Sequence, residues 1–189
     1  MQKINRIFLL LLPLIIFSAC RNDISASDQS AKNIFSVSSS GINDGKIDPI
    51  YGAKGIQFVN GTVPSRSLPL KINGIPAGTR SLAVVMLDPD GKNWVHWLAC
   101  NIQTNGIFLE IPENASLDLK NQMLQGKNDF GTIGYGGPTP PSGIHTYIIK
   151  VYALGDVLSL QSGFSLQNLE KAMKNKILAE AEIRGSYSH

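Results

Sequence analysis

Short apolar runs, each closed by glycine, proline or asparagine, fill the chain from Ile34 to Ala153 and restrict its fold more than any other feature. Such runs favour strands and turns over helices. The runs Ser81–Leu87, Val95–Ile102 and His145–Leu154 are predicted to be strands. Because these runs are almost continuously apolar, we expect sheets that are covered on both sides, as in a β-sandwich or a sheet capped by helices. The predicted fold class is therefore mostly β.

Side-chain alternation assigns the faces of two of these strands. In the second strand it places His96, Leu98, Cys100 and Ile102 on one face and Val95, Trp97 and Ala99 on the other. In the third strand His145, Tyr147, Ile149 and Val151 share a face. Cys100 is interpreted as a small buried apolar residue rather than a reactive thiol.

The spacing of the apolar residues changes near the C-terminus. Ser165 is a candidate N-cap, and Leu166, Leu169, Met173 and Ile177 then recur at helical spacing. Gly185 fits a C′ position after a helix. We therefore predict a C-terminal amphipathic helix, or a pair of helices, that packs its apolar face on the sheet.

The N-terminus carries the pattern of a secretory signal. Lys3 and Arg6 precede the apolar stretch Ile7–Phe17, whose 11 residues are too few for a membrane span, which needs about 20. The small residues that run into Cys20 resemble the lipobox of bacterial lipoproteins. That resemblance implies cleavage before Cys20 and acylation of its thiol and amino group, with palmitate as an expected chain. Cleavage of an ordinary signal peptide near Ala19 is the alternative.

We accordingly divide the chain into a signal peptide over residues 1–19, a lipidated Cys20 with a polar tether over residues 20–33, and one domain over residues 34–189. Arg21 after Cys20, rather than aspartate, favours the outer membrane if the cell has one, with the domain in the cell envelope outside the cytoplasm. Removing the signal peptide leaves 15 basic against 14 acidic residues. This balance argues against a nucleic-acid partner.

Polar and glycine-rich motifs follow or open the predicted strands, where a rigid scaffold usually displays a site. In chain order they are Leu68-Pro69-Leu70, 74–81, Asp88-Pro89-Asp90, His96-Trp97, Asn128-Asp129-Phe130-Gly131, Gly134-Tyr135, Gly137-Pro138-Thr139-Pro140-Pro141 and His145-Thr146-Tyr147. Their order over the domain resembles the bacterial branch of the phosphatidylethanolamine-binding protein (PEBP, Raf-kinase-inhibitor-like) family.

The resemblance implies an antiparallel β-sandwich with short flanking helices and a pocket for phosphate-like anions or phospholipid head groups. The residues at the family's pocket positions are Asp88, Asp90, His96, Gly136, Gly137, Pro138, His145 and Tyr147, with the Gly136–Pro138 segment expected to supply wall and backbone donors. It also implies inhibition or regulation of a partner kinase or protease. Two departures touch the pocket rim: Gly91-Lys92-Asn93 follows Asp90, and Thr146 stands where the family commonly has a basic residue.

The side chains themselves favour binding over catalysis. Two imidazoles, a tyrosine hydroxyl and glycine N–H groups form a donor-rich pocket for an oxyanion, and a carboxylate such as Asp88 can orient a histidine. We expect anions to bind better as the pH falls toward histidine pKa values of about 6.5. Since common hydrolase and kinase motifs are absent from the sequence, neither an enzyme nor a cofactor is predicted. The alternative is a metal-assisted hydrolase in which Asp88, His96 and His145 hold a metal ion.

Overall fold

One large sheet organises the protein. The structure, a computed structural model, describes residues 34–189. The strand order in this sheet is β10-β8-β7-β11-β12-β3-β2. The bounds are β2 Ile42–Asn43, β3 Lys46–Ile47, β7 Ser81–Asp88, β8 Trp94–Ile102, β10 Leu124–Gln125, β11 Ile144–Leu154 and β12 Ile177–Ser188. Neighbouring strands run antiparallel except β12 and β3, which are parallel.

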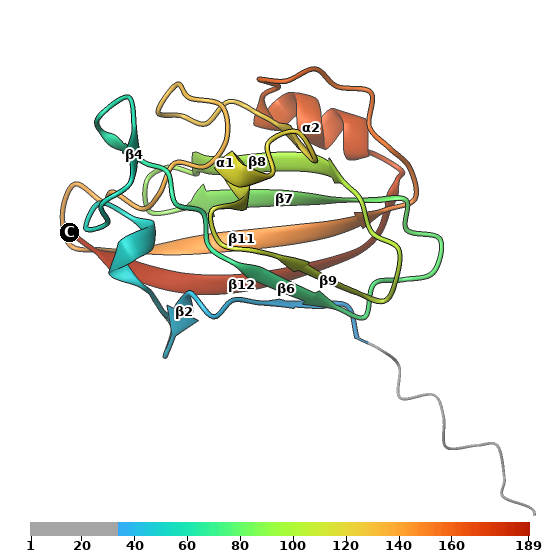
Figure 1. Ribbon diagram of the computed structural model, residues 1–189, viewed down its shortest axis with the longest axis horizontal. Coiled ribbons are helices and arrows are strands. Elements are labelled where there is room, and N and C mark those ends of the chain that lie inside the picture. The colour runs from blue at the N-terminus through green and yellow to red at the C-terminus, as the bar shows by residue number, and fades with distance from the viewer. Residues whose placement is uncertain (1–33) are drawn as a thin grey trace, which may run out of the picture. The chain divides into compact units, whose positions relative to one another are not determined.

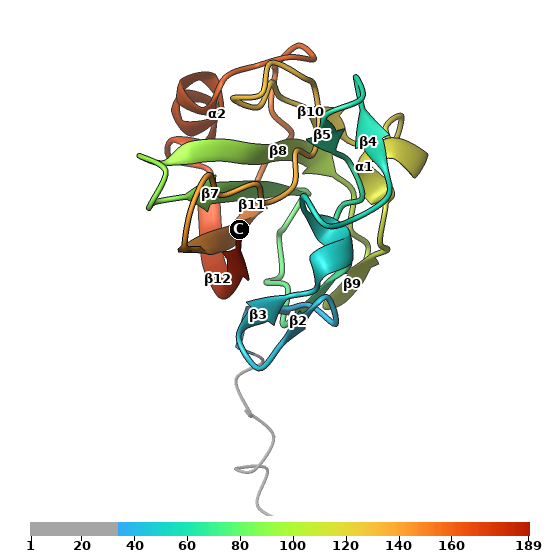
Figure 2. The same cartoon turned by 90° about the vertical axis from the view of Figure 1, so that its left-hand side faces the viewer.

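Smaller elements surround the large sheet. A three-stranded sheet has the order β1-β6-β9, and a two-stranded hairpin joins β4 to β5. The bounds are β1 Ser36–Ser38, η1 Pro49–Tyr51, β4 Phe58–Val59, β5 Val63–Pro64, β6 Leu70–Asn73, β9 Phe108–Ile111, α1 Ala115–Asp118 and α2 Leu166–Met173. Figure 2 shows α2 on one side of the large sheet and β9, β4 and α1 on the other. The prediction of a mostly β fold is confirmed.

The alternation of β7 and β11 divides the apolar core in two. Val84 of β7 and Tyr147 of β11 belong to the cluster between the large and the three-stranded sheets. Val85 and Cys100 belong to the cluster beneath α2. Cys100 has no exposed surface, which confirms the interpretation of this residue as a small buried apolar residue, and this burial raises the pKa of its thiol to about 12.

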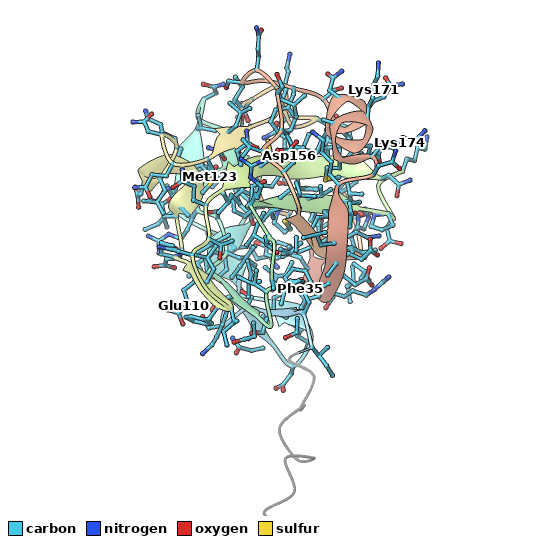
Figure 3. The ribbon with its side chains drawn as sticks, turned by 90° about the vertical axis from the view of Figure 1, so that its right-hand side faces the viewer. Phe35, Glu110, Met123, Asp156, Lys171 and Lys174 are labelled. Carbon is cyan, nitrogen blue, oxygen red and sulfur yellow. The ribbon has the colours of Figure 1, made fainter. Side chains whose placement is uncertain are left out.

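Helix α2 begins as predicted. The Ser165 hydroxyl accepts a hydrogen bond from the Asn168 N–H, and the Asn168 side chain accepts one from the Ser165 N–H. This reciprocal capping box satisfies two donors that the helix itself cannot use. Leu169 and Met173 face the sheet, while Lys171 and Lys174 project from the outer side (Figure 3).

The predicted C-terminal extent of this helix is wrong. The helix ends at Met173, Asn175 adopts a left-handed conformation with φ of 62°, and Ile177 opens the long strand β12. From Ala179 onward small or apolar residues alternate with charged ones, and this period of two matches a strand with one covered face. Gly185 is therefore no helix cap: it pairs with Tyr147, and a Cβ there would lie 2.7 Å from Ile47 Cγ1.

The predicted faces hold for β11 and for the centre of β8 but fail at both ends of β8. His145, Tyr147, Ile149 and Val151 follow the expected alternation, as do Trp97, Leu98, Ala99 and Cys100. Val95 instead packs beneath α2, whereas Ile102 lies in the opposite cluster and the His96 ring contacts Tyr147. The register of β8 against β7 shifts twice, and each extra residue in a bulge reverses the alternation.

The predictions for the signal peptide, Cys20 and the tether lie outside the described residues. Within residues 34–189, the structure contains no helix with the length and apolar character of a membrane span.

Candidate ligand-binding site

The C-terminal end of β7 and the starts of β8 and β11 lie together at one end of the large sheet (Figure 1). They surround a cavity of about 620 Å³. Its lining residues are Asp88, Asp90, Gly91, Lys92, Trp94, His96, Phe130, Thr139, Pro141 and His145. Four of the residues predicted from the sequence, Asp88, Asp90, His96 and His145, therefore come together here.

Asp88 is buried at the end of β7 and orients His145. Its Oδ2 atom accepts a hydrogen bond from His145 Nδ1 at 2.7 Å, and its Oδ1 atom accepts one from the Gly91 N–H at 2.8 Å. A carboxylate only accepts, so His145 carries a proton on Nδ1. Nε2 of His145 has no hydrogen-bond partner among residues 34–189. The carboxylate that the sequence predicted to orient a histidine is Asp88, and the histidine that it contacts is His145.

The turn between β7 and β8 is fixed against β11. Asp88 pairs with Trp94 across the five-residue loop that joins β7 to β8, and its last two residues, Lys92 and Asn93, are left-handed with φ values of 62° and 60°. Asp90 Oδ2 accepts a hydrogen bond from the Thr146 N–H at 2.7 Å, which joins the turn to β11. The Lys92 N–H donates to the Pro89 carbonyl at 3.1 Å, and Lys92 lines the cavity.

His96 is almost fully buried in the cavity wall. Its Nδ1 atom lies 2.6 Å from the Gly136 carbonyl oxygen. Its ring packs edge to face on Phe130 and Tyr147, with centroid distances of 5.5 and 5.0 Å. Burial lowers the pKa of His96, against the opposing effects of the Gly136 carbonyl and the Asp88 and Asp129 carboxylates. The expectation of an ordinary histidine pKa is therefore wrong for His96, because its charged form loses hydration.

The predicted role of Gly136, Gly137 and Pro138 as backbone donors is wrong. The Gly136 N–H donates to the His96 carbonyl and the Gly137 N–H to the Pro64 carbonyl, both at 2.8 Å, and proline has no N–H. All three residues are buried and none lines the cavity. A Cβ at Gly136 would lie 2.6 Å from Phe130 Cδ2. The glycine allows close packing behind the wall rather than close approach of a ligand.

Tyr147 lies behind the lining residues, in contact with His96, and has no exposed surface. Its hydroxyl has no hydrogen-bond partner among the described residues. Burial, with a smaller contribution from Asp88, raises the pKa of Tyr147. Tyr147 is therefore a neutral residue packed behind the cavity and not one of the residues that line it.

Aromatic walls were the part of the site that sequence reasoning largely missed. Phe130 and Trp94 pack edge to face with centroids 5.6 Å apart. Trp94 lines the cavity, whereas Trp97 lies in the core. Phe130 lies in a motif noted in the sequence, but an apolar ring carries no chemical signal that separates a wall from a core. Gly91 and Lys92, expected at the pocket rim, line the cavity, and Thr139 and Pro141 are further lining residues that the sequence did not single out.

Asp88, His96 and His145, the donor set of the metal alternative, line one cavity but do not form a metal-binding group. No group of three or more His, Cys, Asp or Glu side chains within residues 34–189 is placed to hold a metal ion. Both oxygens of Asp88 already accept hydrogen bonds, from the Gly91 N–H and from His145 Nδ1. Residues 34–189 therefore give the metal-assisted hydrolase no support.

A larger groove of about 780 Å³ lies at the opposite end of β8, between Asn101–Gln103, Leu109–Ile111 and Leu119–Leu124. Its charged lining residues are Glu110 and Lys120, and Glu110 already pairs with Lys71 at 3.9 Å. The smaller cavity contains the oriented histidine and the unpaired polar atoms. Chemistry rather than size therefore identifies the candidate site.

Fold and cavity define a mostly β protein with a polar and aromatic pocket at the ends of its central strands. Residues 37–188 match the family model described as phosphatidylethanolamine-binding protein, and the chain belongs to this family. The resemblance inferred from the motifs is confirmed.

Relatives with curated sequences and solved structures agree with this assignment. The UPF0098 protein of Methanothermobacter thermautotrophicus is 40% identical over 137 residues, which are 67% of this chain and 91% of that protein. A PEBP homologue from Chlamydia trachomatis superposes with a TM-score of 0.70 at 30% identity, over 83% of this chain and 99% of that one. E. coli YbcL superposes with a TM-score of 0.68 at 31% identity, over 82% of this chain and 98% of that one.

Proposed function

We propose that this protein is a membrane-anchored, non-catalytic binding protein whose cavity takes a phosphate-like anion or a phospholipid head group. The observation that carries the proposal is the Asp88–His145 pair, which fixes the imidazole ring and leaves Nε2 for a ligand. Lys92 lines the same cavity. A histidine held by a carboxylate beside a lysine is a suitable arrangement for an oxyanion.

The acidic residues of the cavity are compatible with such a ligand. Asp88 accepts hydrogen bonds from Gly91 and His145, and Asp90 accepts one from the Thr146 N–H. Both carboxylates are thus engaged by protein donors, whereas Lys92 takes part in no ion pair among the described residues. The aromatic wall of Trp94 and Phe130 supports an organic group attached to the anion.

Thermal unfolding of the purified protein, titrated with phosphate, phosphoethanolamine and phosphotyrosine, tests the binding proposal. A ligand at 100 times its Kd adds about 2.7 kcal/mol of stability, which raises the Tm of a domain of this size by about 5–10 °C. The Lys92→Gln variant should weaken the effect, and Lys120→Gln in the distant groove should not. If none of the three ligands raises the Tm, or if both variants respond like the parent, the binding proposal fails.

The membrane anchor is proposed from the resemblance of the segment before Cys20 to a lipobox, together with the polar tether that follows it. Mass spectrometry of the mature N-terminus should find an acylated Cys20, and Cys20→Ser should release the protein from the membrane fraction. An unmodified N-terminus elsewhere would contradict the anchor while leaving the cavity's function intact. No feature of residues 34–189 favours kinase or protease inhibition over binding alone, so that role is left out of the proposal.

A further inference from the structure

His96 and Gly136 are joined by two hydrogen bonds in opposite directions. The Gly136 N–H donates to the His96 carbonyl at 2.8 Å, and His96 Nδ1 lies 2.6 Å from the Gly136 carbonyl oxygen. A carbonyl oxygen can only accept, so Nδ1 must carry a proton. In the uncharged ring, Nε2 then has a free lone pair and is an acceptor.

The surroundings of His96 keep this ring uncharged. The ring is packed between Phe130 and Tyr147, and the residue is 2% exposed. The charged or titratable groups near it are the Asp88 and Asp129 carboxylates, the Tyr147 hydroxyl and, around the cavity, Asp90, Lys92 and His145. Burial outweighs the two carboxylates and lowers the pKa of His96, so the neutral ring is the form present near pH 7.

The two histidines therefore present different chemistry to a ligand. Nδ1 of each is bound within the protein, His145 to a carboxylate and His96 to a carbonyl. Only His145 has a carboxylate in direct contact, that of Asp88. His96 lines the cavity as a neutral ring, and neither Nε2 has a partner among the described residues.

We propose that His96 Nε2 is a hydrogen-bond acceptor that selects ligands bearing an N–H or O–H donor next to their anionic group. This inference rests on the proposed binding function and adds a specificity-determining residue to it. The donor is either a protonated amine or the P–OH group of a singly ionised phosphate. A ligand that presents only acceptors there places lone pair against lone pair, and polar sites reject analogues that lack the matching donor.

Stepwise methylation of phosphoethanolamine separates donor loss from size. Isothermal titration calorimetry at pH 7.5 would compare phosphoethanolamine with its N-methyl, N,N-dimethyl and N,N,N-trimethyl forms, of which only the last, phosphocholine, has no N–H. If the amine is the donor, affinity should fall about tenfold or more at the last step and little before it. A second arm compares phosphate with sulfate across the pH range in which phosphate takes up a proton. If P–OH is the donor, the phosphate-to-sulfate ratio of affinities should rise as the pH falls, because other titrating groups affect both anions.

Two outcomes separate this inference from the proposed function. If all of these ligands bind, the last methylation leaves the affinity unchanged and the phosphate-to-sulfate ratio of affinities does not rise as the pH falls, then His96 is no selective acceptor and the inference is overturned. If nothing binds in either arm, the proposed function itself fails. The His96→Gln variant, whose amide both donates and accepts, should bind with reduced discrimination, whereas Lys120→Gln should discriminate like the parent. The unmodified protein decides the question even if the His96 variant does not fold.

Discussion

Replacing Gly136 with alanine tests whether this glycine serves packing behind the cavity wall. Its φ lies outside the left-handed region, so alanine meets no backbone strain. The new Cβ would lie 2.6 Å from Phe130 Cδ2 and 3.0 Å from Asn128 Nδ2. Asn128 is held by hydrogen bonds to Thr132 and to the Gly134 carbonyl, so Phe130 has to move, and with it one wall of the cavity.

The expected loss can be estimated from a matched control. Gly106→Ala places its Cβ in open space, so it should stabilise by about 0.4–1 kcal/mol through the unfolded chain alone. Gly136→Ala has the same benefit but adds overpacking of about 1–3 kcal/mol. With an m-value of about 2 kcal/mol/M, the urea midpoints of the two variants should differ by about 0.5–1.5 M. The Gly136 variant should also bind phosphoethanolamine more weakly. Equal midpoints and equal affinities would refute the packing role.

Further predictions concern other parts of the domain. Because burial lowers the folded-state pKa of His96, the folded state binds fewer protons than the unfolded state below a pH of about 6.5. Urea unfolding between pH 7.5 and pH 5 should therefore show the parent losing stability relative to His96→Gln as the pH falls. A difference in unfolding free energy between the two proteins that stays constant with pH would contradict this. Asp88→Asn should cost about 1.5–3 kcal/mol by removing a charged acceptor from His145, measured by urea unfolding at pH 7; an unchanged midpoint would mean that the pair contributes nothing. Ser165→Ala should cost about 1 kcal/mol through loss of the capping box, whereas Ser159→Ala, in the loop before α2, should be near neutral. The peptide that contains Cys100 should remain unlabelled by iodoacetamide at pH 8 until the protein is unfolded, because burial raises the thiol pKa to about 12.

The sequence predicted the central strands and the start of α2 because these signals are local. Apolar runs, turn residues and the Ser165 cap each act within a few positions of themselves. The C-terminal strand was missed because Ile177 happens to continue the helical spacing of Leu169 and Met173, although the alternation after Ala179 is a readable strand pattern. The bulges of β8 depend on pairing with β7, which no single segment specifies.

The candidate site was predictable only in its polar half. Asp88, Asp90, His96 and His145 were identified from motif order, and all four line the cavity. What separates the two histidines is tertiary: His145 meets a carboxylate from β7, and His96 meets the carbonyl of Gly136, 40 residues away. The packing role of Gly136 likewise depends on a distant contact with Phe130.

Histidine NMR offers the most direct test of the claim that this cavity binds a phosphate-bearing ligand. The chain has three histidines, of which His96 and His145 line the cavity and His189 contacts the Pro140 carbonyl near the C-terminus. On titration with phosphoethanolamine, the ring nitrogen signals of His96 and His145 should shift together and saturate, and those of His189 should change little. Unchanged signals for His96 and His145 at saturating ligand would contradict the claim.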